Sequence, residues 1–137
     1  MAARTKPRRQ WRDYRTQSGR RPVKDLLDEL TDEEIAAIVA GMKDVVARGL
    51  PAARHLRGDI YEVRADAATR SFRLLFATEG LYSQVLLSLS VFEKRTQRTP
   101  PAEISLAENR LRDWRARGLA MRKAVALQKK RGKAADP

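Results

Sequence analysis

Residues 60–92 read IYEVRADAATRSFRLLFATEGLYSQVLLSLSVF, and this stretch predicts three β-strands joined by short turns. Apolar and charged residues alternate over 60–65, and the aromatic and leucine side chains of 71–77 fall mainly on one face of a strand. Residues 81–92 are the most apolar, so they predict a central strand that is buried in part on both faces. Tight connections between consecutive strands favour an antiparallel meander.

Two amphipathic helices are expected before these strands. Residues 23–30 carry apolar side chains at the spacing i, i+3, i+4 and i+7. Thr31 followed by Glu34 forms a capping box, which predicts a second helix that ends near Gly49. A weak alternation of aromatic and polar residues over 11–15 indicates a first, shorter strand.

A third amphipathic helix is expected after the strands. It should begin at Pro101, because apolar residues then recur at helical spacing as far as Trp114. Gly118 is one expected end, and the helix-prone residues 119–128 allow the helix to continue. The predicted fold class is α+β in the order β-α-α-β-β-β-α: a small antiparallel sheet, mixed at the first strand, with a helical hairpin on one face and a C-terminal helix.

The net charge of +12 is unevenly distributed along the chain. Residues 1–21 carry +7, residues 118–137 carry +5, and residues 22–117 sum to zero. We therefore expect a basic disordered arm (1–10), a domain over 11–117, and a basic extension that is partly helical and then disordered from about residue 129. Such charge attracts polyanions, or it serves only solubility and nonspecific contact with nucleic acid.

Several classes of protein are excluded by composition. The absence of cysteine rules out disulfide scaffolds and thiolate metal sites. No apolar run resembles a signal peptide or could span a bilayer, so we expect a cytoplasmic protein without a membrane partner. There is no glycine-rich phosphate loop and no metal-ligand spacing, so no cofactor or metal is expected. His55 is the only histidine and is expected to be a surface or packing residue, which excludes RNA cleavage by a pair of histidines.

Cations from separate strands are the candidates for a functional site. Arg64 ends one predicted strand, Arg73 lies within the next, and three more cations follow the last, namely Lys94, Arg95 and Arg98. An arginine between two apolar residues is costly to bury unpaired. It either forms a structural ion pair, with Glu62 as the obvious partner, or faces an anionic ligand such as a phosphate, and both can hold together. Nearby rings would stack on bases or belong to the core; these are Tyr61, Tyr82 and Phe92.

Five motifs occur in a distinctive order and spacing. They are Gly19, Pro22, Val23, Leu27 and Leu30; HLRGDIYEVR at 55–64; FRLLF at 72–76; FEKRTQRTP at 92–100; and Glu103, Ile104, Ala107 and Arg110. Together they make residues 11–117 resemble the RelE/HigB-like superfamily of bacterial toxins, in its phage-derived HigB-type branch. The resemblance implies a ribosome-dependent, metal-independent endoribonuclease (an mRNA interferase) that inhibits translation. It also implies neutralisation by an antitoxin, often a helix-turn-helix protein.

The resemblance also assigns roles to residues. Arg64 and Arg73 would hold the scissile phosphate while the 2′-hydroxyl of the RNA attacks it. Lys94 would hold a nearby phosphate or assist the developing oxyanion, and Glu62 would orient Arg73 or act as a base. The remaining candidates would bind RNA; these are Arg95, Arg98, Tyr61, Phe92 and Gln97.

One departure keeps two other functions open. Several toxins of the superfamily transfer protons with a Tyr or His near the C-terminal end, and none follows Gln97 here. The nearest substitutes are Glu93 and Lys94, so the general acid has no assignment. A non-catalytic RNA- or ribosome-binding protein of the same fold is one alternative. A phage-derived protein-interaction module that uses the helical hairpin is the other.

Overall fold

The computed structural model describes residues 7–135, with side chains as far as Gly132. Short connections join the helices and strands. In chain order they are β1 (Gln10–Asp13), α1 (Pro22–Leu27), α2 (Asp32–Arg48), a 3-10 helix (Leu50–Ala52), β2 (Arg54–Arg57), β3 (Ile60–Asp66), β4 (Ser71–Glu79), β5 (Val85–Glu93) and α3 (Pro101–Ala135).

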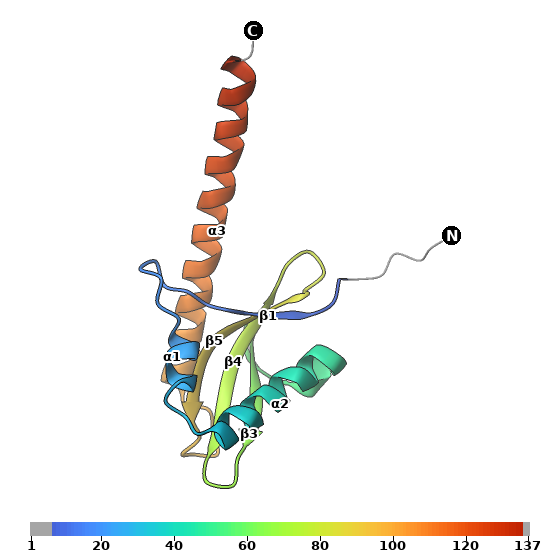
Figure 1. Cartoon of the computed structure of the whole chain (residues 1–137), viewed down its shortest axis with the longest axis vertical. Coiled ribbons are helices and arrows are strands. Elements are labelled where there is room, and N and C mark those ends of the chain that lie inside the picture. Colours follow the sequence, from blue (N-terminus) through green and yellow to red (C-terminus); the bar gives the residue numbers. More distant parts are fainter. Residues whose placement is uncertain (1–6, 136–137) are drawn as a thin grey trace, which may run out of the picture.

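The strands form one sheet in the order β1-β5-β4-β3-β2 (Figure 1). β1 runs parallel to β5, and each other neighbouring pair is antiparallel. The α+β fold with a sheet that is mixed only at its first strand is therefore confirmed.

The sheet nevertheless contains a strand that the sequence pattern does not predict. Residues RHLR of β2 show no alternation of apolar and polar side chains, and only Leu56 among them is half-buried. The strand forms because Gly58 adopts a φ of 55° and turns the chain back so that it pairs with β3. β2 is thus an edge strand, set by a turn and by pairing rather than by a buried face.

The last strand begins later than expected, at Val85 instead of residue 81. Residues 80–83 form a turn in which the amide of Ser83 donates a hydrogen bond to the carbonyl of Gly80 (3.1 Å). Gly80 and Ser83 both have positive φ angles, 92° and 54°. Leu81 therefore lies almost fully exposed at the tip of the β4–β5 turn instead of within the strand.

Both faces of the sheet are covered by helices. On one face the α1–α2 hairpin packs on a cluster that includes Phe72, Leu74 and Phe76. On the other face the first part of α3 packs on a cluster that includes Leu75 and Leu89. The central strand β4 is consequently buried on both sides from residue 72 to residue 77.

The helical hairpin follows its sequence signals closely. The capping box is present: Thr31 and Glu34 exchange hydrogen bonds between side chain and backbone at the start of α2. α2 ends at Arg48, before Gly49 with a φ of 76°. α1 is shorter than expected, because its last predicted residues form turns in which the amide of Leu30 bonds to the carbonyl of Leu27.

α3 continues much further than the sequence predicts. It passes Gly118 without interruption and runs to Ala135, so it includes residues 129–135, for which the sequence predicts disorder. Residues 119–131 consist largely of Ala, Leu, Met, Lys, Arg and Gln, which all favour helix, and they outweigh the cost of a single glycine. Residues 136–137 lie outside the described residues.

The basic N-terminal arm is described only from residue 7, so the expectation for 1–6 lies outside the structure. Its end is held to the domain, because Arg9 donates to the carbonyl of Val46 (3.0 Å) and the amide of Gln10 to that of Gln84 (2.8 Å). In the described part of the chain, no helix combines the length and the apolar character needed to cross a membrane.

Candidate active site

The site is built around Glu62, which projects from β3 toward the face of the sheet that α3 covers. Its side chain is 1% exposed. Its Oε1 lies 3.6 Å from Nε of Arg73 and 3.8 Å from Nε of Arg64, and its Oε2 accepts a hydrogen bond from the hydroxyl of Thr99. One buried carboxylate thus holds two guanidinium groups and the loop that precedes α3.

Strand register explains why these residues meet. Arg64 and Arg73 are direct partners across the antiparallel β3–β4 pair, and Glu62 is two residues from Arg64 on the same face. Arg73 in turn lies opposite Phe92 of β5. Of the cations expected to converge from separate strands, the sheet places Arg64 and Arg73 beside Glu62, and Glu62 is the partner that the sequence suggested for Arg73.

The two arginines differ in their access to solvent. Arg73 is buried: its Nη1 donates to the carbonyl of Phe72 (3.1 Å) and lies 3.8 Å from a carboxylate oxygen of Asp66. The side chain of Arg64 is 54% exposed. Glu62 offsets part of the cost of burying the guanidinium of Arg73. Arg64 is therefore the cation of this cluster that an approaching anion would meet first.

A polar groove adjoins the cluster at the end of the sheet. It has a volume of about 620 Å³ and lies between the β3–β4 turn and the segment after β5. Its wall includes Ser71, which pairs in register with Asp66. A carboxylate oxygen of Asp66 lies 3.8 Å from Nη1 of Arg73. Lys94, Arg95 and Gln97 line the opposite wall. The groove therefore gathers Lys94, Arg95 and Gln97 at the same end of the sheet as the arginine cluster, while none of its lining residues belongs to that cluster.

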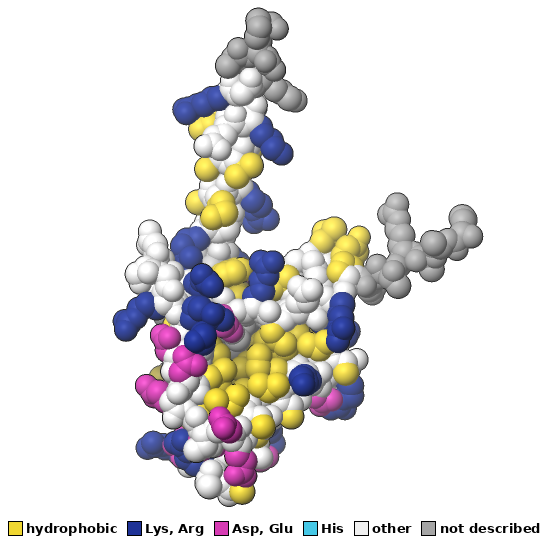
Figure 2. Space-filling view, viewed as in Figure 1, with side chains coloured by type: hydrophobic (Ala, Val, Ile, Leu, Met, Phe, Trp, Pro, Cys, Tyr) yellow, Lys and Arg dark blue, Asp and Glu magenta, His cyan; other side chains and the backbone are white. Residues whose placement is uncertain are grey.

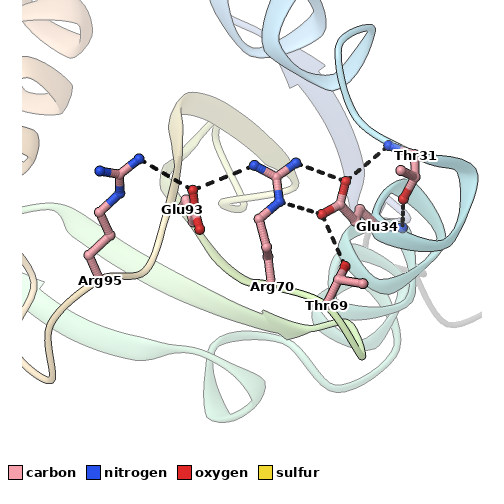
Figure 3. A network of polar contacts seen from close by, with 6 residues as sticks. All are labelled: Thr31, Glu34, Thr69, Arg70, Glu93 and Arg95. Atoms are coloured by element: carbon pink, nitrogen blue, oxygen red, sulfur yellow. Dashed lines mark hydrogen bonds and ion pairs between the residues drawn. The ribbon is translucent and has the colours of Figure 1, made fainter.

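A second ionic network joins the two walls of this groove, with Thr69 and Arg70 on one side and Glu93 and Arg95 on the other (Figure 3). Arg70 donates to both oxygens of Glu34, with distances of 2.6 and 3.0 Å, and its Nη1 lies 3.5 Å from Glu93. Glu93 also lies 3.5 Å from Arg95, and Thr69 donates to Glu34 (3.4 Å). The network connects the start of α2 to the β3–β4 turn and to the end of β5.

The electrostatics of this network favour its charged form. Hydrogen bonds from Arg70, and then from the backbone of Thr31, lower the pKa of Glu34 from 4.5 to about 2. The carboxylate of Glu34 in turn raises the pKa of Arg70. Arg70 is not among the site residues expected from the sequence, and the only sequence signal for Glu34 is the capping box.

Of the other sequence candidates, Tyr61 and Tyr82 lie apart from the cluster, whereas Phe92 lies opposite Arg73. Tyr61 faces the α2 side of the sheet, where its ring centroid is 5.1 Å from that of His55 and 5.8 Å from that of Phe76. Tyr82 is exposed in the β4–β5 turn. Phe92 is half-buried on the α3 side, opposite Arg73, and Arg98 is exposed in the loop before α3.

His55 is exposed, and its Nε2 lies 2.7 Å from the carbonyl oxygen of Gly58. Within the residues that the structure describes, no cluster of three or more Asp, Glu or His side chains could hold a metal ion.

Two comparisons with known proteins identify relatives of this chain. Residues 25–112 match the family model described as "Phage derived protein Gp49-like (DUF891)". The chain is 33% identical over 108 residues to the "Probable endoribonuclease HigB1" of Mycobacterium tuberculosis, in both strain CDC 1551 / Oshkosh and strain ATCC 25618 / H37Rv. The alignment covers 77% of this chain and 84% of each relative. The chain therefore belongs to the phage-derived Gp49-like family and to its HigB-type branch.

Proposed function

We propose that this protein is the toxin of a toxin–antitoxin pair and an endoribonuclease that cuts messenger RNA on the ribosome. The observation that carries the proposal is the cluster in which buried Glu62 holds Arg64 and Arg73, with the polar groove beside it. The similarity to a protein described as a probable endoribonuclease supports the same activity.

In the proposed reaction the 2′-hydroxyl oxygen of the RNA attacks the adjacent phosphorus. The bond from phosphorus to the 5′ oxygen breaks, which leaves a 2′,3′-cyclic phosphate and a 5′-hydroxyl end. A proton leaves the 2′-hydroxyl, and another reaches the 5′ oxygen. The role of the protein is to orient the phosphate and to stabilise the negative charge that builds up on it.

Arg64 is the residue that we propose contacts the phosphate first, since its guanidinium is exposed and held on one side by Glu62. Arg73 would add positive charge from beneath. Glu62 fits a positioning role better than that of a base, because it is buried and its oxygens already face two guanidinium groups and Thr99. Lys94 lies just after the end of β5, two residues beyond Phe92. It is our candidate proton donor.

The RNA strand would continue from the arginine cluster into the polar groove. Arg95 and Gln97 line it, and Arg98 is exposed just after it, so these side chains are suited to flanking phosphates and bases. Tyr61 would contact RNA only at a separate place, because it lies on the other face of the sheet.

A second function, RNA or ribosome binding without cleavage, is favoured by one observation. No Tyr or His follows Tyr82 in the sequence, so the proton-transfer residue of several related toxins has no counterpart after Gln97. A protein of this kind would bind ribosomes with a steep dependence on salt and leave the RNA intact.

The partners of the toxin follow from the same proposal. The antitoxin would be encoded by a short neighbouring reading frame, typically as a helix-turn-helix protein, and both would act in the cytoplasm. Coexpression of that neighbouring product should restore growth to cells that express the toxin.

The test is induction of the wild type and of Arg64→Ala in growing cells, followed by mapping of the 5′ ends of transcripts. Wild type should stop growth and cut messages, and Arg64→Ala should reduce the cleavage rate about 10²-fold. Arg73→Lys should also reduce it, because a lysine keeps the charge but not the planar guanidinium.

The matched control is Arg48→Ala, which removes a similarly exposed arginine that pairs with Asp44 on α2, away from the cluster. It should cut RNA like the wild type. Intact transcripts and normal growth on induction of the wild type would refute the endoribonuclease proposal.

A further inference from the structure

The C-terminal half of α3 extends away from the domain as a single helix (Figure 1). Every residue from 118 to 132 is exposed, and this segment is about 22 Å long at the usual helical rise. Isolated helices of this length are only marginally stable in water. A projecting helix without tertiary contacts gains stability when a partner covers it.

One side of this projecting helix is apolar. A shallow groove of about 390 Å³ follows Gly118, Met121, Arg122, Val125, Ala126 and Lys129, which recur at the spacing of one helix face. Met121 is 70% exposed and Val125 is 47% exposed, four residues apart along this face. We call this set of six residues the α3 stripe.

The α3 stripe continues onto the body of the domain. A second groove, of about 710 Å³, shares Gly118 and Arg122 with it and leads to Trp114 and to exposed Leu81 on the β4–β5 turn. The two grooves together offer a partner a continuous track from the sheet domain along the helix.

The charge around the α3 stripe has a single sign. Residues 118–132 contain five cations and no acid; the cations are Arg122, Lys123, Lys129, Lys130 and Arg131. Figure 2 shows hydrophobic side chains along the projecting helix with Lys and Arg on both sides and no acidic side chain among them. Arg122 and Lys129 belong to the stripe itself, and their stems contribute to its apolar surface.

We propose that the α3 stripe binds an acidic amphipathic helix of a protein partner. Its apolar side chains would cover Met121 and Val125, and its carboxylates would pair with Arg122 and Lys129. RNA is a poorer match, since phosphates would pair with the cations but leave the apolar side chains exposed to water. A second copy of this chain is also a poorer match, because five cations on each helix would repel.

The experiment uses the full chain and a labelled synthetic peptide of about 18 residues that places Leu on one helical face and Glu on the other. A peptide of the same composition in scrambled order controls for net charge. Fluorescence anisotropy at about 150 mM salt measures both affinities. The amphipathic peptide should bind at least about tenfold more tightly than the scrambled one.

The decisive variant is Met121→Ala with Val125→Ala, which removes the apolar side chains but keeps the helix, since alanine has the highest helix propensity. It should weaken binding of the amphipathic peptide at least about tenfold. The matched control is Leu127→Ala, because Leu127 is 52% exposed on the same helix but lies about 160° around it from Val125. It should bind like the wild type.

Three results would overturn the proposal. The first is equal affinity for both peptides, which would mean that net charge alone accounts for the binding. The second is a single-stranded RNA that binds through Arg122 and Lys129 while the amphipathic peptide does not bind. The third is a dimer in sedimentation that disappears in the Met121→Ala, Val125→Ala variant, which would assign the surface to a second copy. These readouts do not involve RNA cleavage, so they are independent of the proposed endoribonuclease activity.

Discussion

At the scale of single residues, the candidate site depends on one buried carboxylate. Glu62 lies within 4 Å of two guanidinium groups and accepts a hydrogen bond from Thr99, so it sets the position of Arg64 and Arg73 together. A charge at this depth is tolerated because Oε1 faces two guanidinium groups and Oε2 accepts a hydrogen bond. Its loss should affect catalysis through the arginines.

We expect Glu62→Gln to lower the single-turnover rate of RNA cleavage about 10²-fold, because the amide no longer attracts the guanidinium groups and they shift from their working positions. If Glu62 only positions the arginines, the pH profile of the remaining activity keeps its shape. Loss of the acidic limb of that profile would instead make Glu62 the base. Glu108→Gln, which breaks an ion pair with Arg57 away from the cluster, should leave the rate unchanged.

A second residue-scale effect concerns stability. The pKa of Glu34 is lowered to about 2, mainly by Arg70, so the folded protein holds this carboxylate charged more strongly than the unfolded chain does. The stabilisation is complete above about pH 4.5 and is lost as the pH falls toward 2.

Urea unfolding at about pH 5 and about pH 2.5 measures this effect. Wild type should lose more unfolding free energy between the two pH values than Glu34→Gln does, because the variant lacks the titrating group. The comparison with the variant removes the contribution of other carboxylates. Equal losses in both proteins would contradict the assignment of the shifted group.

At the scale of elements, helix ends are set by local chemistry. α2 begins with the Thr31–Glu34 capping box and ends before Gly49, whose φ of 76° and ψ of −157° suit glycine alone. A β-carbon at Gly49 would also lie 2.7 Å from the guanidinium of Arg9. α3 contains Gly118 in a regular helix and passes through it.

This contrast predicts opposite effects for one substitution at two glycines. Gly49→Ala should lower the unfolding free energy by about 1–3 kcal/mol, because the left-handed backbone is strained with a side chain. Gly118→Ala should not destabilise the domain and should increase the helical circular dichroism signal, since nothing lies within 4 Å of its added carbon. An unfolding free energy of Gly49→Ala equal to that of the wild type would show that the backbone after α2 adjusts to a side chain without strain.

At the scale of the whole molecule, the domain and its projecting helix are held together where α3 contacts the residues that follow β1. The hydroxyl of buried Tyr14 donates to Asp113, and Arg117 donates to Asp113 and to the carbonyl of Arg15. Burial, followed by Asp113, raises the pKa of Tyr14, so its hydroxyl keeps its proton at neutral pH. Beyond Arg117 the helix leaves the domain.

A chain that ends at Arg117 should therefore unfold at the temperature of the full chain within about 2 °C, because every residue of 118–132 is exposed. Its helical signal should fall in proportion to the residues removed. Thermal unfolding followed by circular dichroism gives both values. A large drop in the unfolding temperature would mean that the projecting helix contributes to the core.

Sequence pattern was sufficient for the order of elements apart from β2, for the capping box and for the pairing of Glu62 with Arg73. Each of these depends on periodicity or on neighbours close in the chain. Strand alternation alone also separates Tyr61 from Glu62, since adjacent residues point to opposite faces. The strand β2 was missed because an edge strand needs no buried face and shows no pattern.

The remaining features come from tertiary structure, since they join residues that are far apart in the chain. Thr99 reaches Glu62 across 37 positions, and Arg70 reaches Glu34 across 36. Such contacts depend on strand register and on the angle of α2 against the sheet, which no local pattern specifies. The basic character of the termini can be read from composition. Whether residues 118–132 form an exposed helix depends on where the hydrophobic core ends. Hydrophobic packing sets that limit, and it places the candidate active site and the α3 stripe on separate parts of the molecule.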